Sequence, residues 1–407
     1  MPGYFCLGSV FGFVRLPDER EIMARINWQQ INWYNTTFLL GTVALTLTAV
    51  PAYLWQHGLS WFQAGLFVLF FILTGLSITL GYHRLFSHHA FQAAWPVRLL
   101  TLIFGAAAFE NSALTWCDDH RRHHKHTDHE EDPYDISKGF FHAHMGWIMF
   151  KLGEPPTYAS VPDLERDPLV RWQHKYYVVI GLLAGFVLPA VLGWFWGGAD
   201  AALGAFLIAG VARTVFVHHS TFFINSLCHT LGKQPYSDRC TARDHWLMAF
   251  FTFGEGYHNF HHAFQHDYRN GVKAWQFDPT KWSIWLLSKV GLASQLRRVP
   301  DERIRHAEIT EQQRQLAMKM AALPAAQLAP VRAQVEAVQA RLHEAFERWE
   351  KLEIEYRRAM EKKIEASREK VAQLSHDFRE AREKLVVAFH EWEQTHSSAL
   401  STMLAGA

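Results

Sequence analysis

Four long apolar stretches constrain the fold of this 407-residue chain more than any other feature. They cover residues 37–55, 61–82, 176–196 and 201–218. A helix needs about 20 mainly apolar residues to cross a bilayer, so each stretch has about the length of one crossing. Only residues 56–60 separate the first two stretches, and only residues 197–200 separate the third from the fourth. The sequence therefore predicts an all-α integral membrane protein whose four transmembrane helices form two hairpins.

The basic residues predict the orientation of these helices. Arg15, Arg20 and Arg25 precede the first stretch, whereas the link at 56–60 holds no Lys or Arg. Because cytoplasmic loops carry the excess of positive charge, we expect both termini to face the cytoplasm. The bacterial inner membrane fits this arrangement. No short apolar core with a cleavage site precedes the first stretch, so a removable signal peptide is not expected.

Composition narrows the functional classes. The net charge of +1 gives no general attraction to nucleic acid. The four cysteines form no CxxC pair, so neither a disulfide framework nor a thiolate metal site is indicated. A glycine-rich dinucleotide motif after a strand is also missing from the sequence. If the chain carries out redox chemistry, its electrons must come from a separate ferredoxin, cytochrome or flavin reductase.

Histidines carry the clearest chemical signal. Nine of the 25 lie in short clusters: HRLFSH, HRRHH, HNFHH, and the end of NSLCH. Imidazole nitrogens are favoured ligands of first-row transition metals. Nine nitrogens are too many for one ion, so the clusters predict two metal ions. The predicted ligands are His83, His88, His120, His123, His124, His229, His258, His261 and His262.

Helix geometry explains the spacing of most of these ligands. On a helix, His120 and His124 lie one turn apart with His123 beside them, and HNFHH repeats that spacing. Asn225 lies four residues before His229, so we expect both on one helix face, with Asn225 holding a water on a metal. His83 and His88 lie five residues apart, about 140° around an ideal α-helix. We therefore expect the helix to end and bend between them.

These clusters resemble the histidine boxes of membrane fatty acid desaturases, the stearoyl-CoA desaturase group in particular. The three boxes are similar in order and spacing, and Asn225-SLC-His229 matches that group's additional motif. The resemblance covers about residues 30–290. It implies a non-haem di-iron enzyme that uses O2 and two electrons to introduce a cis double bond near carbon nine of an acyl chain. It also implies that one iron is held by His83, His88, His120, His124 and His262, and the other by His123, His229, His258 and His261, with Asn225 acting through water.

The acyl carrier is left open by the sequence. Animal acyl-CoA members often have a basic residue before the Asp-His of the second box, whereas this chain has Asp118. A CoA thioester is favoured by the overall resemblance, and a phospholipid or a carrier-protein thioester is the alternative. The substrate-contacting candidates are Trp116, Arg121, Arg122, Lys125 and Arg239.

The chain divides into three parts by composition. Residues 1–30 form a cytoplasmic N-terminal segment, of which 1–22 is either a short tail or an extended start before Met23. Residues 31–295 form the four-span catalytic domain. Residues 296–407 are charged and carry a heptad-like apolar repeat, broken near 362–368, with Pro324 and Pro330 breaking an opening helix. This extension is predicted to be a long helix or helical hairpin. Two roles are open for it: a coiled coil for self-association or partner docking, and packing on its own catalytic domain.

Two other functions remain open from the residues alone. A lipid hydroxylase or alkane monooxygenase would use the same metals and oxygen on the same scaffold. A non-enzymatic metal transporter or sensor would also need histidines, but transporters place their ligands within the spans, near the bilayer midplane. Here the clusters lie beyond the ends of the apolar stretches, which favours an enzyme.

Overall fold

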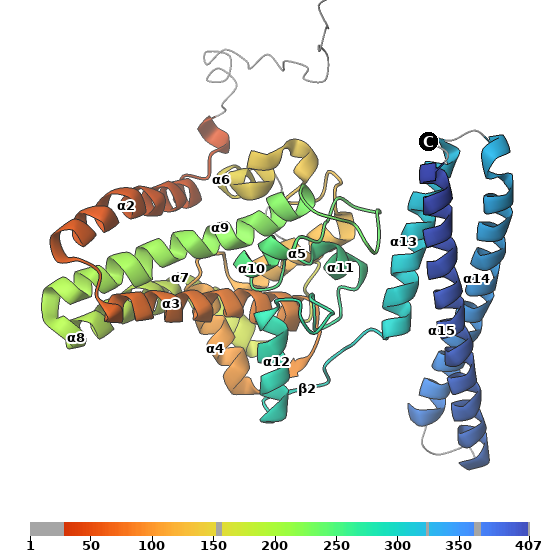
Figure 1. Cartoon of the computed structure of the whole chain (residues 1–407). Coiled ribbons are helices and arrows are strands. Elements are labelled where there is room, and N and C mark those ends of the chain that lie inside the picture. The colour runs from red at the N-terminus through yellow and green to blue at the C-terminus, as the bar shows by residue number, and fades with distance from the viewer. Residues whose placement is uncertain (1–27, 152–156, 323–324, 362–367, 406–407) are drawn as a thin grey trace, which may run out of the picture. The chain divides into compact units, whose positions relative to one another are not determined.

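The computed structural model describes residues 28–151, 157–322, 325–361 and 368–405 (Figure 1). The extended start considered above, residues 1–22, lies outside these ranges. The chain forms two compact units. The first comprises Met1–Ser87 and Trp95–Ser226, and the second comprises His88–Ala94 and Leu227–Ala407. The described residues of each unit are mainly helical, as the sequence predicts.

The first unit holds the apolar helices. After a 3-10 turn at Trp28–Gln30, α2 covers Trp33–His57 and α3 covers Trp61–Leu76, continuing as a π-helix over Ser77–Ser87. Ser60 begins α3 with a capping box, in which its hydroxyl accepts from Gln63 N while the Gln63 side chain accepts from Ser60 N. The short link between the first two apolar helices is thus confirmed.

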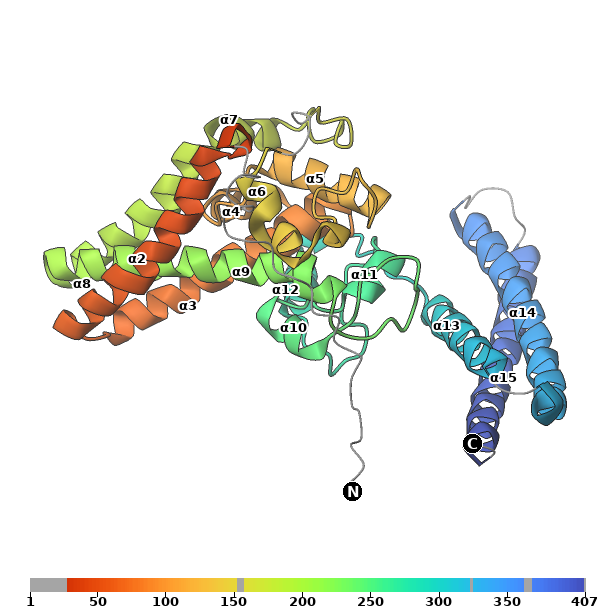
Figure 2. The ribbon, with the colours of Figure 1, turned by 90° about the horizontal axis from the view of Figure 1, so that it is seen from above.

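A long helical run follows in the same unit. It consists of α7 (Pro168–Leu182), a π-helix (Leu183–Val187), α8 (Leu188–Ala205), a second π-helix (Phe206–Ala212) and α9 (Arg213–Ser226). Within α8 the backbone leaves the helical conformation at Gly197 and Gly198, where φ at Gly198 is +71°. Glycine adopts this conformation without steric cost. Figure 2 shows the chain turning back within α8, so that α9 runs away from that end. Among the described residues, three segments are long and apolar enough to cross a membrane: 33–57, 61–87 and 168–229.

One buried arginine joins several of these helices. Arg213 at the start of α9 is fully buried, and its guanidinium donates to the carbonyls of Ala209, Ala107 and Gly185 at 3.1, 2.6 and 3.0 Å. Burying a charged group away from water is costly unless it is hydrogen-bonded. These three bonds therefore tie α9 to the π-helix at 183–187 and to the end of α4 (Trp95–Ala106).

Shorter elements complete the first unit. Helix α5 covers Ala113–His126, and Ser112 caps it by accepting from Thr115 N. A 3-10 turn at Ile136–Lys138, a π-helix at His142–Gly146 and α6 (Trp147–Met149) follow. Helix α5 carries the second histidine cluster, as predicted from HRRHH.

The second unit contains the third cluster and the C-terminal helices. Strand β1 (Gln92–Ala93) pairs antiparallel with β2 (Ala293–Ser294), matching Gln92 with Ser294. The helices are a 3-10 turn at Leu227–His229, α10 (Trp246–Phe251), α11 (His258–Ala263), α12 (Pro279–Lys289), α13 (Asp301–Ala321), α14 (Ala325–Glu361) and α15 (Arg368–Ala405).

The last two helices form a hairpin, and α13 shares its core (Figure 1). Trp349, Leu385 and Trp392 are almost completely buried there, and Trp392 Nε1 donates to Gln312 of α13 at 3.0 Å. The apolar positions of the heptad-like repeat therefore face this core. The expected break at Pro330 is wrong, because α14 begins at Ala325 and continues through that position. Self-association through this segment stays a prediction.

The first of these helices also contacts the region of the third histidine box. Ile304 and Ala307 of α13 pack with Phe260 of α11 and with Tyr236. Arg314 forms an ion pair with Asp238 at 2.9 Å. The C-terminal extension is thus attached to the histidine-bearing part of its own unit, which is the second of the two roles left open above.

Candidate metal centre

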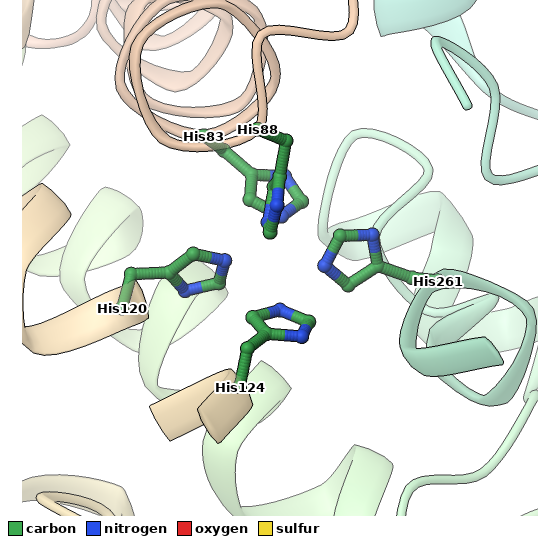
Figure 3. Close-up of side chains that lie close together, drawn as sticks. All are labelled: His83, His88, His120, His124 and His261. Atoms are coloured by element: carbon green, nitrogen blue, oxygen red, sulfur yellow. The ribbon is translucent and has the colours of Figure 1, made fainter. Parts of the chain in front are cut away.

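A π-helix positions the first pair of histidines. His83 lies within the π-helix Ser77–Ser87, and His88 follows its last residue directly. In a π-helix the hydrogen bonds join residues five apart, so such residues lie nearly above one another. The predicted helix end between the two residues is confirmed, because Ser87 is the last helical residue. The sequence did not predict that the preceding turns are widened into a π-helix, and both rings extend from that helix end (Figure 3).

Helix α5 supplies the second set. Its last two turns carry His120, His123 and His124, and the rings of His120 and His124 lie 4.7 Å apart between centroids. Trp116, one turn before His120, stacks on that ring at 4.8 Å. The tryptophan also lies edge-on to His83 at 6.2 Å. The indole ring of Trp116 therefore packs against both imidazoles and restricts their rotation.

The third set lies on α11, a helix of six residues that depends on its surroundings. The Asp244 carboxylate accepts from the backbone N–H groups of Asn259 and Phe260 at 2.7 and 3.0 Å, at the N-terminal end of the helix. The Asn259 side chain donates to the carbonyls of Ser237 and Ala242. Isolated helices this short are unstable in water, so these bonds hold the histidines of HNFHH in place.

The loop before α11 requires glycine. Gly254 has φ +100°, and a Cβ atom there would lie 2.6 Å from Asp278 Oδ1. A Cβ on Gly256 would lie 2.1 Å from Ala249 N. The motif Gly254-Glu255-Gly256 thus allows the backbone to approach α10 and the start of α12 closely.

The structure brings the nine predicted histidines into two groups. One consists of His83, His88, His120, His124 and His261, and the other of His123, His229, His258 and His262. Within each group, one nitrogen from every ring lies within 4.8 Å of the others. Figure 3 shows the first group, with rings directed toward a common centre. The expected division is wrong for two residues: His261 lies in the first group and His262 in the second, because neighbours on a helix point about 100° apart.

Ring nitrogens face one another in the second group. His258 Nε2 lies 3.1 Å from both His229 Nε2 and His262 Nε2. Asn225 is half-buried near the end of α9, but the helix changes to a 3-10 turn at Leu227–His229. Asn225 and His229 therefore do not lie on one continuous α-helix, and the role of Asn225 through a water stays a prediction.

Hydrogen bonds fix the orientation of several rings. His123 Nδ1 donates to Asp132 Oδ1 at 2.8 Å, and both side chains are buried. His229 Nδ1 lies 2.8 Å from Thr241 Oγ1. His266 Nδ1 donates to the His88 carbonyl at 2.8 Å. A carboxylate or hydroxyl that accepts a hydrogen bond from one ring nitrogen fixes the proton there, so the other nitrogen keeps its lone pair. Metal-bound histidines commonly have such hydrogen-bond partners.

The carboxylate of Asp132 remains ionised at neutral pH. Burial alone would raise its pKa, but bonds from His123, Tyr134 N and Asp128 N outweigh that effect and hold the pKa below its usual 3.8. An ionised Asp132 accepts from the Nδ1–H of His123 and leaves Nε2 of that ring with its lone pair.

Some of the candidate substrate residues form hydrogen bonds or ion pairs within the protein, and others are exposed. The Arg121 guanidinium donates to the carbonyls of Phe86 and Ser87 and pairs with Asp163 at 2.6 Å. Arg122 pairs with Asp119 at 3.0 Å. Lys125 and Arg239 are exposed. Arg121 therefore connects α5 to the π-helix, and its contact with substrate stays a prediction.

Asp118 also has a structural explanation. Its side chain is buried, and Oδ1 accepts from Ser160 N at 3.1 Å. The residue at this position therefore supports the loop after α6 and does not present a charge to solvent.

Sequence reasoning missed three supporting residues. Asp132 and Thr241 contact ligand candidates on the side away from the metal, and Glu110 lies half-buried between α4 and α5, where it accepts from Thr221 Oγ1 at 2.8 Å. Burial raises the pKa of Glu110 to about 8. Asp132 had a weak signal, since it ends an acidic run nine residues after His123. Thr241 and Glu110 had none.

The donor set fits transition-metal ions. Each group offers four or five imidazole nitrogens, and seven of the nine histidine residues are buried. Neutral nitrogen ligands suit ions such as iron, copper and zinc and suit calcium or magnesium poorly. The two histidine groups are therefore compatible with the binding of transition-metal ions.

Comparison with known proteins agrees with this geometry. The fatty acid desaturase family matches residues 59–285. The chain is 42% identical over 306 residues to acyl-CoA desaturase 1 of Saccharomyces cerevisiae. The matched region covers 72% of this chain and 58% of the yeast protein. It is 35% identical to the sn-1 stearoyl-lipid 9-desaturase of Anabaena variabilis, over 66% of this chain and 94% of that protein.

An animal relative shows a similar likeness. Stearoyl-CoA desaturase 5 of Homo sapiens is 34% identical over 56% of this chain and 70% of the human protein. The match spans less than two thirds of the length of the Saccharomyces cerevisiae relative, 58%. The family match covers more than half of the chain and includes all three histidine boxes. This chain is an integral membrane protein that belongs to the fatty acid desaturase family.

Proposed function

We propose that this protein is a fatty acyl desaturase that introduces a cis double bond, near carbon nine, into a saturated acyl chain. The observation that carries the proposal is the convergence of nine histidines into two adjacent groups in a chain whose relatives bear desaturase names. The reaction consumes O2 and two electrons, which a separate ferredoxin, cytochrome or flavin reductase delivers.

The proposed metals are two iron ions. An unactivated methylene has no acidic proton, so acid–base side chains cannot begin its oxidation, and bound iron supplies the redox chemistry with O2. Zinc suits the same ligands but has no redox chemistry. The first histidine group would hold one ion and the second group the other, with Asn225 reaching the second through water.

The protein's own residues would orient and protect this centre. Asp132 keeps His123 in one tautomer, Thr241 restrains His229, and Trp116 shields His83 and His120 from one side. Every residue of the first group except His124 is buried, so water has restricted access to the ligands.

The proposed topology has four spans. The segment 168–229 has the length of two crossings, and the break at Gly197–Gly198 divides it. The domain division is proposed at 31–295 for the four-span part and 296–407 for the extension. Both termini would face the cytoplasm, and a bacterial inner membrane would be the location.

The relatives support two acyl carriers. Acyl-CoA desaturase 1 and the sn-1 stearoyl-lipid 9-desaturase differ in the carrier that their names state. We propose a CoA thioester, since the relative of higher identity is named for it. Lys125 and Arg239 are the exposed cations that remain available for its phosphates. Purified protein with a donor system should convert stearoyl-CoA; conversion of stearoyl-phospholipid alone would contradict this choice.

Expression in a strain that lacks unsaturated fatty acids tests the reaction. A new cis double bond in the extracted lipids is expected. A hydroxylated chain would favour a hydroxylase on the same scaffold, and unchanged lipids with altered metal uptake would favour a metal-binding protein. His123→Ala and His261→Ala should abolish the product, while His129→Ala, an exposed residue in the loop after α5, should retain it. Iron per protein after anaerobic purification should approach two.

A further inference from the structure

Two short helices of the second unit carry apolar side chains on their outer faces. Helix α10 exposes Trp246, Leu247, Phe250 and Phe251, and α12 exposes Trp282, Trp285 and Leu286. Large exposed apolar patches on a folded protein usually mark an interaction surface. We refer to these seven residues, together with Trp275 and Val290, as the α10–α12 face.

Helix α12 buries Thr280, Lys281 and Ile284 and keeps its tryptophans exposed. Trp282, Trp285, Leu286 and Lys289 follow the spacing of one helix face, and all four are exposed. On the inward face, Thr280 and Lys281 are buried, and Lys281 Nζ donates to the carbonyls of Lys273 and Gln276 at 3.0 and 3.3 Å. A helix at a water-exposed surface normally buries its apolar side chains and exposes its charged ones. Helix α12 instead buries a hydrogen-bonded lysine and exposes two tryptophans.

Helix α10 repeats this arrangement. Met248 and Ala249 are buried, while the pairs Trp246–Phe250 and Leu247–Phe251 point outward. Ring contacts link the two helices through Phe277, which lies 5.1 Å from Phe250 and 5.4 Å from Trp282. The two helices therefore present one continuous apolar surface.

The composition of this face matches the polar–apolar boundary of a lipid bilayer. Tryptophan is enriched at membrane interfaces because its ring is apolar and its N–H is polar. The face contains four tryptophans: Trp246, Trp275, Trp282 and Trp285. Lys289 lies over the Trp285 ring at 5.1 Å, and a lysine in that position can extend its charge toward lipid phosphates.

Chain connectivity joins the unit that carries this face directly to a candidate membrane span. Strand β1 begins five residues after Ser87, the last residue of the candidate span 61–87, and two residues after β1 the apolar helix α4 begins at Trp95. Strand β2 pairs with β1, and Ala94 N donates to Leu292 O at 2.9 Å, three residues after Lys289. The end of α12 is thus fixed to the segment that leaves the bilayer.

We infer that the α10–α12 face lies in the interfacial layer of the bilayer, on the side where the span 61–87 ends, and inserts its aromatic side chains among the lipid chains. The occupant of this surface is lipid. The second unit is then attached to the membrane by its own surface in addition to its covalent links to the spans.

Spin labels test this placement in the full-length protein in nanodiscs of phosphatidylcholine and phosphatidylglycerol. Leu286→Cys, Phe250→Cys and Val290→Cys each place a label on the face, in a background with Cys6 and Cys240 replaced by serine. Cys117 and Cys228 are buried and stay in place. Val387→Cys on α15 is the matched control, because Val387 and Phe250 are both 58% exposed and Leu286 is 60% exposed.

The measurement is the ratio of collision rates with O2, which concentrates in lipid, and with a water-soluble nickel chelate. For a face buried about 5–10 Å into the boundary region, the ratio should be several-fold higher at the face positions than at Val387. Equal ratios at all positions would overturn the inference, since the face would then be in water. Labels shielded from both reagents would also overturn it, since another protein surface would then cover the face. Three labelled positions guard against the loss of folding in any one variant, which iron content checks.

Discussion

The bond between Asp132 and His123 permits the sharpest test of the metal centre. Asp132 Oδ1 accepts from His123 Nδ1 at 2.8 Å and from Tyr134 N at 3.0 Å, while Oδ2 accepts from Asp128 N at 3.1 Å. Asp132→Asn keeps the shape but replaces one accepting oxygen with an N–H2 group. That group must face either Asp128 N–H or the imidazole, so a donor meets a donor at one of the two places.

The expected magnitude follows from the bond that is lost. A hydrogen bond to a charged group contributes about 1.5–3 kcal/mol. Loss of a partner behind a metal-bound histidine typically costs about 10–100-fold in metal affinity, or about 1.4–2.7 kcal/mol. The two estimates agree. We therefore expect Asp132→Asn to bind iron about 10–100-fold more weakly while the protein stays folded in the membrane.

Competition with a chelator measures this difference. Protein loaded with ferrous iron under anaerobic conditions is titrated with chelator, and iron per protein is determined at each step. Asp135→Asn is the matched control, because Asp135 is also buried and accepts from Ser137 N in the same loop. Wild-type affinity in Asp132→Asn, or an equal loss in Asp135→Asn, would refute the argument.

The pH dependence separates Asp132 from the imidazoles. Because the folded pKa of Asp132 lies below its usual 3.8, the stability that its carboxylate contributes is present above that value and is lost as the pH falls through the folded pKa. Protons and iron compete for the same imidazole nitrogens, so a variant that binds iron more weakly loses it at a higher pH. Asp132→Asn should therefore raise the pH at which half of the iron is lost, measured as iron per protein after equilibration at each pH.

Three further predictions concern other parts of the chain. Burial raises the pKa of Glu110 to about 8, so stability should fall by up to about 1.4 kcal/mol per pH unit between its usual 4.5 and 8, and Glu110→Gln should raise the melting temperature at pH 8 but leave it unchanged at pH 4. Gly254→Ala should destabilise the protein by roughly 1–3 kcal/mol because of its positive φ, measured as a lower melting temperature, while Gly65→Ala, with open space around it, should not. Trp392→Ala should cost about 3–5 kcal/mol in the C-terminal core and make α13–α15 sensitive to trypsin, whereas Val387→Ala on the surface should leave the cleavage pattern unchanged.

The helical architecture and the histidine groups could be predicted because their signals are local. Apolar length predicted the long helices, and the spacing of HRRHH placed three rings near one another on α5. The allocation of His261 and His262 could not be obtained this way. The two residues are neighbours on a helix of six residues, so a modest rotation of α11 decides which ring meets which group, and Asp244 fixes that rotation from 14 residues upstream of His258.

The π-helix illustrates a second limit. The spacing of His83 and His88 conflicts with an α-helix, and the sequence alone supports either a bend or a widened turn. The choice depends on packing: Tyr82 is fully buried and its hydroxyl accepts from Gln173 of α7 at 2.6 Å, and Cys117 of α5 donates to the Tyr82 carbonyl. Both partners lie far away along the chain, so no local pattern reveals them.

The scattered origin of the histidines has a consequence for biosynthesis. A ribosome that has completed the chain only as far as Tyr257 has made four of the five members of the first group and two of the four members of the second. Neither histidine group is complete until α11 has been made, and all three candidate spans precede α11 in the chain. If the groups hold metal as proposed, loading would follow synthesis of the spans, and a nascent polypeptide stalled before α11 would carry only incomplete histidine sets.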